Sequence, residues 1–117
     1  MRAGDDYAAC MFQDRTGDVA VIFRSTRNGE DEAGYAAAAE AMDRLAAAQP
    51  GYLGIDSARG PDGVGLTVSY WADDASAIAW RDHPEHARVR ELGRRRWYDD
   101  YRVDVARVER CYAWRRA

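Results

Sequence analysis

The chain has two histidines, His83 and His86, which lie three residues apart in the segment His-Pro-Glu-His. Imidazole exchanges protons near neutral pH, so either side chain is a candidate general base. Structural roles are equally open: His83 can cap a helix that begins at Pro84, and His86 can bond to Glu85 or a backbone carbonyl. The pair could also hold a metal, but no third ligand at a convincing spacing supports a metal site.

Three of the four tryptophans, Trp71, Trp80 and Trp97, lie in the same part of the chain. They could line a pocket for a flat aromatic ligand. The alternative is packing in the core and at a dimer interface. Ser69 precedes Trp71 by two residues on a predicted strand, so its hydroxyl is expected on the same face.

All 17 basic residues are arginine, which indicates a coding bias and lowers the functional weight of any single arginine. Arg90 and Arg94–Arg96 could bind an anionic ligand such as a carboxylate. They could equally form a solvent-exposed face near the end of a helix, where its dipole favours positive charge. Arg24, at the end of the first predicted strand, is a second candidate for orienting an anionic oxygen.

Composition and length restrict the classes of protein that are possible. The 117 residues predict one domain, and a net charge of −3 argues against a dedicated nucleic-acid binder. No segment reaches the roughly 20 apolar residues of a membrane span, and no secretory signal is visible, so we expect a cytoplasmic protein. Cys10 and Cys111 match no metal or redox spacing, which favours reduced thiols over a disulfide.

Hydrophobic periodicity predicts an α+β fold with the ferredoxin-like order βαββαβ and an antiparallel sheet. Residues 1–18 are expected to be an N-terminal arm and residues 19–117 the domain. The predicted strands cover residues 19–27, 52–59, 64–71 and 101–114, and the predicted helices cover residues 30–49, 73–82 and 84–97.

The side-chain pattern also assigns faces. In strand 64–71, Val64, Leu66, Val68 and Tyr70 are expected to meet the helices, and Gly65, Thr67, Ser69 and Trp71 a cavity. The pattern of helix 73–82 predicts burial of Ala75, Ile78 and Ala79, and helix 84–97 places His86, Val89, Gly93 and Trp97 on one face. A change of phase between Val105 and Val108 predicts a β-bulge.

A ferredoxin-like sheet has helices on one face only. The uncovered face is expected to carry Val21 and Trp71, which are too apolar to remain in water. We therefore expect a homodimer that closes a shared α+β barrel, with the C-terminal strand reaching the partner.

Several segments, in this order, resemble the antibiotic biosynthesis monooxygenase superfamily, in particular its small bacterial branch known as YqjZ-like or haem-degrading-monooxygenase-like. They are VAVIFRS, QPGYLGIDSAR, GLTVSYW, AIAWRDHPEH, GRRRWYDDY and VARVERCYAW. The resemblance covers residues 19–114. It implies a dimeric α+β barrel with a ligand cavity between each sheet and its helices.

The resemblance also offers two chemistries. Haem-degrading relatives use an asparagine, a tryptophan and a haem-ligating histidine. Trp80 matches the tryptophan, whereas Arg90 stands where the histidine is expected and Arg24-Ser25 where the asparagine is. The cofactor-free relatives activate a phenolic substrate, which passes an electron to dioxygen, and they need only polar and aromatic cavity residues.

The resulting hypothesis is a cofactor-independent monooxygenase of a small aromatic or polyketide-like substrate. His86, Trp80 and His83 are its predicted catalytic residues. Its predicted substrate-binding residues are Trp71, Arg24, Arg94, Ser69 and Trp97, with no metal. The alternatives are a non-catalytic ligand-binding or stress-related protein of the same fold, and a haem-binding or haem-degrading protein.

Overall fold

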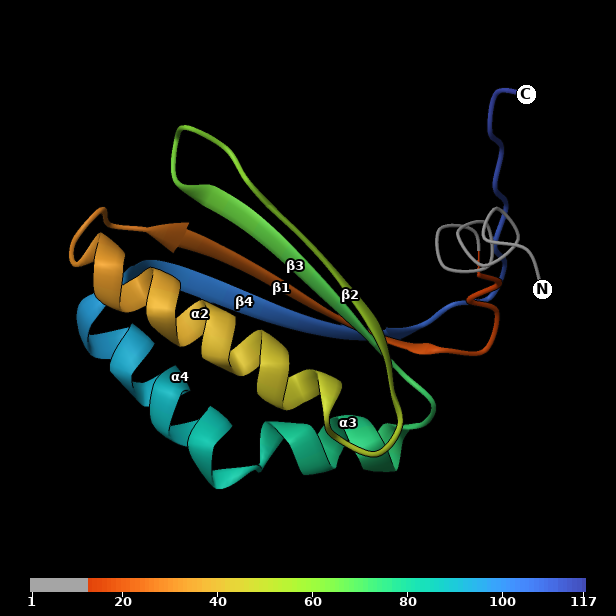
Figure 1. Cartoon of the computed structure of the whole chain (residues 1–117), viewed down its shortest axis with the longest axis horizontal. Coiled ribbons are helices and arrows are strands. Elements are labelled where there is room, and N and C mark those ends of the chain that lie inside the picture. The colour runs from red at the N-terminus through yellow and green to blue at the C-terminus, as the bar shows by residue number, and fades with distance from the viewer. Residues whose placement is uncertain (1–12) are drawn as a thin grey trace.

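The computed structural model describes residues 13–117 and confirms the predicted α+β ferredoxin-like order. Its four strands form one antiparallel sheet in the order β2-β3-β1-β4. The helices cover one face of this sheet (Figure 1). The elements are β1 (Val19–Arg27), α2 (Glu32–Ala47), β2 (Tyr52–Arg59), β3 (Val64–Trp71), α3 (Asp74–Arg81), α4 (Pro84–Arg96) and β4 (Tyr98–Arg107).

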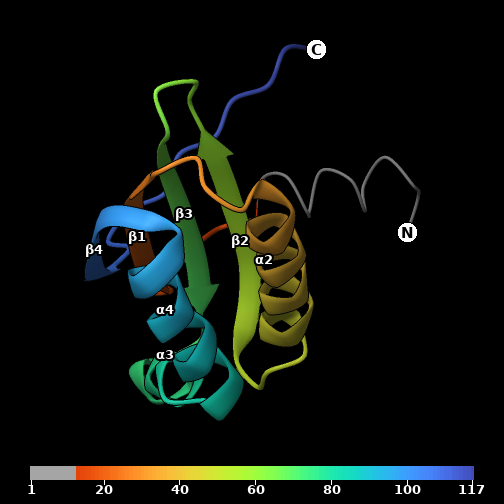
Figure 2. The same ribbon diagram turned by 90° about the vertical axis from the view of Figure 1, so that its left-hand side faces the viewer.

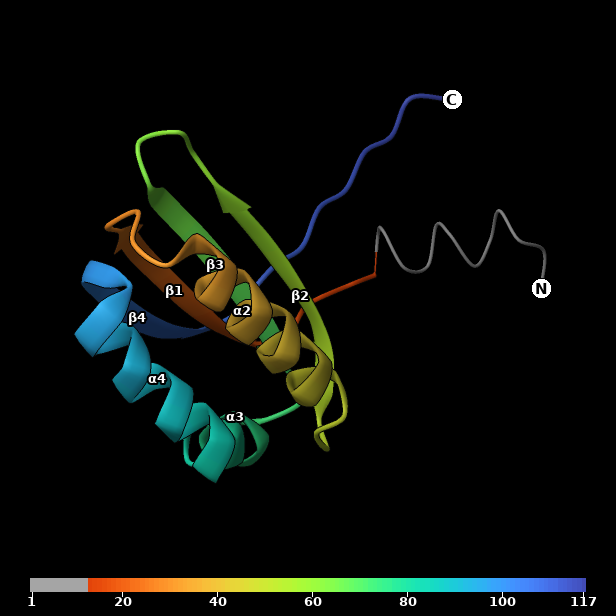
Figure 3. The same ribbon diagram turned by 60° about the vertical axis from the view of Figure 1, so that its left-hand side comes forward.

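The helical layer has two separate parts. Helix α2 runs beside β2, whereas α3 and α4 follow one another beneath β1 and β4 (Figures 2 and 3). In agreement with this arrangement, α2 makes its main contacts with β2, and α4 makes its main contacts with β4. Residues from both parts and from the sheet line a common cavity, described below.

Side-chain capping sets where each helix begins. Asp31 takes a left-handed conformation, with φ 51°, and its carboxylate accepts a hydrogen bond from the Gly34 amide, so α2 starts at Glu32 rather than at residue 30. Asp73 accepts from the Ser76 amide at 2.8 Å and caps α3. The ring of His83 accepts from the Glu85 amide at 3.2 Å, which confirms its expected capping role.

The face assignment in β3 is correct for one set of residues and wrong for the other. Gly65, Thr67, Ser69 and Trp71 do face the interior, but this is also the face that the helices cover. Leu66 is 49% exposed on the opposite, open face. Regular alternation cannot distinguish the two faces when both carry apolar residues, and the buried indole of Trp71 decides the outcome.

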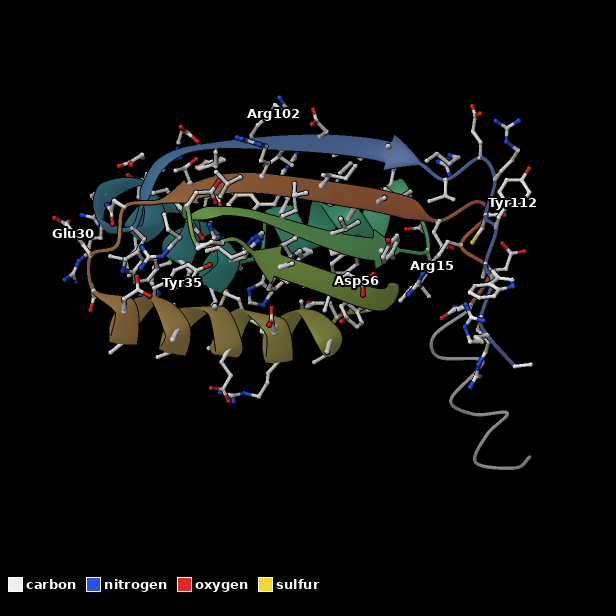
Figure 4. All side chains as sticks on the ribbon, turned by 90° about the horizontal axis from the view of Figure 1, so that it is seen from above. Arg15, Glu30, Tyr35, Asp56, Arg102 and Tyr112 are labelled. Atoms are coloured by element: carbon white, nitrogen blue, oxygen red, sulfur yellow. The ribbon has the colours of Figure 1, made fainter. Side chains whose placement is uncertain are left out.

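The expected composition of the open face is wrong for the same reason. Trp71 is fully buried in the core, and Val21 lines the space beneath the helices. The open face instead carries Ile22, Leu66 and Val68, because Ile22 pairs with Val68 and Leu66 lies two residues before it. Figure 4 looks onto this face. An apolar patch is thus present, but it consists of other residues.

The predicted buried face of α3 is wrong. Ala77 and Trp80 point into the core, whereas Ile78 is 48% exposed. An indole buries more apolar surface than an isoleucine side chain, and the cap at Asp73 fixes the rotation of this short helix, so Trp80 takes the interior position.

The last strand is shorter than predicted and starts earlier, at Tyr98. Its pairing with β1 is continuous up to Arg107, so the bulge expected between Val105 and Val108 is absent. The one irregularity in this pairing lies at the other end, next to Arg27. Beyond Arg107, Val108 still exchanges backbone hydrogen bonds with Gly17 and Asp18, at 2.8 and 3.0 Å, and the pairing ends at the turn that precedes β1. Residues 109–117 form a tail that leaves the body, with Tyr112 and Trp114 86% and 75% exposed (Figure 4).

The N-terminal arm is described only from residue 13. Arg15 lies over the ring of Tyr70, with 4.2 Å from its guanidinium carbon to the ring centroid, and Nη1 donates to the Leu53 carbonyl at 3.3 Å. These contacts place residues 13–18 against the sheet. The first part of the arm, with Cys10, lies outside the described residues, and Cys111 is an exposed free thiol.

The core is centred on Trp71. It is fully buried and packs with Val19, Ala46, Ala77 and Trp80. Truncating so large a side chain removes its apolar contacts and leaves a cavity.

We therefore expect Trp71→Ala to lower the free energy of unfolding by about 3–5 kcal/mol. Urea denaturation followed by circular dichroism measures this change. The control is Arg88→Ala on α4, an exposed residue whose ion pair is with Glu85. It should change stability by less than about 1 kcal/mol. Equal effects of the two substitutions would contradict the central place of Trp71.

Candidate functional site

A cavity of about 730 Å³ lies between the sheet and the two parts of the helical layer. This volume is within the range of pockets that bind small organic ligands. Its floor is apolar and includes Phe23 and Val103 from neighbouring strands. Helix α2 contributes small or flexible side chains, among them Ala38 and Met42. The cavity is therefore suited to the rings of a hydrophobic ligand.

One end of the cavity wall is a stack of three rings. The indoles of Trp71 and Trp80 are stacked at 6.3 Å between centroids and 23° between planes. The imidazole of His86 lies on the other side of Trp80, at 4.3 Å and 8°. Trp80 and His86 both line the cavity, whereas Trp71 lies behind them in the core. The stack fixes the orientation of the His86 ring.

A hydrogen bond determines the protonation of the His86 ring. Its Nδ1 lies 2.9 Å from the carbonyl oxygen of Trp80, and a carbonyl can only accept, so Nδ1 carries the proton. The lone pair of the neutral ring is then on Nε2. Burial lowers the pKa of His86 below 6.5, and the positive charge of Arg90 lowers it further, against the opposing effect of the Trp80 carbonyl. His86 is therefore a neutral imidazole with a free acceptor nitrogen.

Two more of the predicted binding residues line the cavity. Ser69 accepts a hydrogen bond from Trp71 Nε1 at 2.9 Å, so its own proton can serve another acceptor. Trp97 donates from Nε1 to the Asp31 carboxylate at 3.1 Å and presents its ring to the cavity. Trp97 thus fills both roles that the sequence left open for the tryptophans, because it is buried by packing and also lines the cavity.

Arg94 also lines the cavity. Its Nε donates to the Tyr101 hydroxyl at 2.6 Å, and its guanidinium lies 5.6 Å from the ring centroid of Tyr101. Nη1 of the same guanidinium forms an ion pair with the Glu91 carboxylate, at 3.5 Å.

Two predicted residues lie elsewhere. Arg24 is exposed and pairs in register with Leu66 and Arg102, on the open face of the sheet. His83 caps α4 outside the cavity, with its ring 5.7 Å from that of Trp80. His86, Trp80, Ser69, Arg94 and Trp97 thus line one cavity, whereas Arg24 and His83 lie outside it. Trp80 and His86 are stacked at one end, and Arg94 and Trp97 lie at the other, beside Tyr101 and Tyr35.

Sequence reasoning missed a group of tyrosines at the other end of the cavity. Tyr35, Tyr98 and Tyr101 line it, and Phe23 packs against both Tyr98 and Tyr101, at 5.6 and 5.3 Å between centroids. Burial raises the pKa of Tyr98, and the charge interaction and hydrogen bond with Tyr35 add to this effect, so the Tyr98 hydroxyl keeps its proton. The segment GRRRWYDDY contains Tyr98 and Tyr101, but placing them in the cavity from the sequence required knowing that β4 begins at Tyr98.

Residues 13–117 contain no group of three or more His, Cys, Asp or Glu side chains able to hold a metal ion. Within the same described range, no helix is long and apolar enough to cross a membrane.

The lowered pKa of His86 makes a prediction about stability. The unfolded chain binds a proton at His86 with a pKa near 6.5, and the folded chain binds it only at lower pH. Between the two values the unfolded state holds more protons, so stability should fall as pH is lowered through this window. Urea denaturation at several pH values, with ¹⁵N NMR of the His86 ring, measures both effects. His86→Gln should flatten this part of the profile. An unchanged slope in that variant would contradict the assignment.

Comparison with known proteins was consistent with this fold. The sequence model described as antibiotic biosynthesis monooxygenase matches residues 18–92. The uncharacterised protein YqjZ of Bacillus subtilis (strain 168) is 50% identical over 91 residues, which cover 78% of this chain and 79% of that protein.

Solved structures share the architecture at low sequence identity. A conserved protein from Methanosarcina mazei aligns with a TM-score of 0.72 at 8% identity, over 80% of this chain and 95% of that one. SnoaB from Streptomyces nogalater, a cofactor-independent oxygenase, aligns with a TM-score of 0.64 at 18% identity, over 79% and 95% of the two chains. A Mycobacterium tuberculosis protein aligns at 0.67 and 19% identity, over 76% and 92%. At these identities the likeness establishes the fold.

Proposed function

Because the chain belongs to the antibiotic biosynthesis monooxygenase family, we propose that it is a cofactor-independent monooxygenase of a small aromatic or polyketide-like substrate. The observation that supports this most is the neutral imidazole of His86, stacked on Trp80 in the wall of an apolar cavity. One structural neighbour, SnoaB, is a cofactor-independent oxygenase, which is consistent with chemistry that needs no bound group.

In the proposed reaction, Nε2 of His86 takes the proton of a substrate phenol. The phenolate passes one electron to dioxygen, and the two radicals combine to form a C–O bond on the ring. Loss of the ring C–H proton then breaks the O–O bond. One oxygen atom stays as a quinone carbonyl and the other leaves as water, with the substrate as the only reductant.

The cavity residues have distinct roles in this proposal. Trp80 binds the face of the substrate ring next to His86, and Trp97 contacts the ligand at the other end of the cavity. The Ser69 hydroxyl can donate to a substrate oxygen. Arg94 lies on one side of the cavity, where its positive charge can stabilise an oxyanion of the substrate. Trp71 supports Trp80 from behind, and His83 holds the start of α4, so both position the site without touching a ligand.

A non-catalytic ligand-binding protein of the same fold is the competing hypothesis. A cavity filled by its own side chains would favour it. The cavity here instead has about 730 Å³ of free volume and reaches His86, which supports a site for chemistry.

Loss of the base should separate binding from turnover. With 1-naphthol as the probe, we expect His86→Asn to lower kcat by about 10²- to 10⁴-fold with little change in affinity. Oxygen consumption and quinone absorbance report turnover, and calorimetry reports binding. The control His83→Asn changes the cap outside the cavity and should retain turnover.

Unchanged turnover in His86→Asn would contradict the role of the base. Haem titration tests the third hypothesis: a saturable Soret shift that His86→Asn abolishes would replace the proposed function with haem binding.

We also propose that two chains pair through the open face of the sheet. Leu66 is 49% exposed there, beside Ile22 and Val68, and single domains seldom leave such a patch in water. The tail after Arg107 projects beyond the sheet, with Trp114 exposed, and could reach the second chain (Figure 1).

Two residues of nearly equal exposure test this pairing. Leu66→Asp places a charge on the open face and should give a monomer, whereas Ile78→Asp places it on the helical side and should leave a dimer. Sedimentation equilibrium or light scattering after size exclusion measures the mass. A dimer in both variants would contradict pairing through this face.

A further inference from the structure

Helix α4 presents a second polar side chain to the cavity. Arg90 follows His86 by one turn, so the two project from the same side of the helix, about 6 Å apart along its axis. Both line the cavity. A guanidinium has five N–H donors. Among residues 13–117, the hydrogen bonding of Arg90 is limited to one contact, from Nη1 to the Arg81 carbonyl at 3.1 Å.

The neighbouring arginines differ from Arg90 in this respect. Arg81 donates twice to the Asp82 carboxylate, at 2.9 and 3.2 Å. Arg94 is occupied by Tyr101 and by its ion pair with Glu91. Arg90 is therefore the cavity arginine with the most unused donors, and it is half-buried rather than free in solvent.

The charges around Arg90 do not supply an obvious partner. Its positive charge lowers the pKa of His86, in agreement with their separation of one turn on α4. It also lowers the pKa of Asp82, but that carboxylate already accepts both hydrogen bonds from Arg81. On the α2 wall, burial raises the pKa of Asp43, and no arginine opposes this effect. The α4 wall thus carries a positive charge without a dedicated anion.

We propose that Arg90 binds a carboxylate on the ligand, so that the preferred substrates are hydroxylated polycyclic aromatic acids rather than neutral phenols. This inference rests on the proposed function, because it takes the phenol to be at His86 Nε2. Guanidinium groups bind carboxylates with two parallel hydrogen bonds, and this geometry would use the free donors of Arg90. The apolar floor and Trp80 would then hold the rings between the two polar ends.

A matched pair of ligands tests the inference. Isothermal titration calorimetry is performed with 1-hydroxy-2-naphthoate and with 1-naphthol, which lacks the carboxylate. We expect the acid to bind about tenfold more tightly to the natural protein. Arg90→Gln should remove this preference and leave the affinity for 1-naphthol unchanged. Added salt should weaken binding of the acid alone.

The control is Arg95→Gln, which removes the same charge from an exposed position on α4 outside the cavity. It should retain the preference for the acid. Equal affinities for the two ligands, or a preference that survives in Arg90→Gln, would overturn the role of Arg90 and leave the proposed function intact. Failure of both ligands to bind would overturn the proposed function together with the inference.

Discussion

The stack of Trp71, Trp80 and His86 is the contact on which the rest of the structure depends. It joins a central strand to the two helices that follow it in the chain. Trp71 is fully buried, so its position is set by the core, and Trp80 transfers that position to the His86 ring. A polar group on an apolar cavity wall is thereby held by packing rather than by a network of charges. Such support gives a fixed geometry at little electrostatic cost.

Local signals in the sequence were sufficient for most of the fold. Capping residues and Pro84 marked the helices, because these features act within a single turn. The end of β4 was beyond local reasoning, since it depends on pairing with residues 17–27, a contact between distant segments. The faces of β3 were ambiguous for a similar reason: both carry apolar residues, and only the position of the helices distinguishes them.

In the candidate site, too, local features could be predicted and contacts between distant segments could not. His86 was identified by its residue type and Trp80 by the family resemblance, and the structure adds that their rings are stacked across a helix break. Arg24 was misplaced because a residue at a strand end can lie on either face, and its register with Leu66 puts it on the open one. The tyrosines were missed because they join the cavity only when β4 lies beside β1. Side chains from distant segments thus account for most of what the sequence left undetermined.

The division of the helical layer into two parts has a further consequence. All three members of the stack belong to β3, α3 and α4, whereas α2 contributes a wall built largely of alanines, such as Ala38 and Ala39. Larger or smaller residues on that wall would reshape the space without disturbing the imidazole. In the proposed reaction, selectivity and reactivity would therefore depend on separable parts of one small domain. Relatives could diverge in the molecules they bind through changes on a single helix, while keeping the same stacked rings.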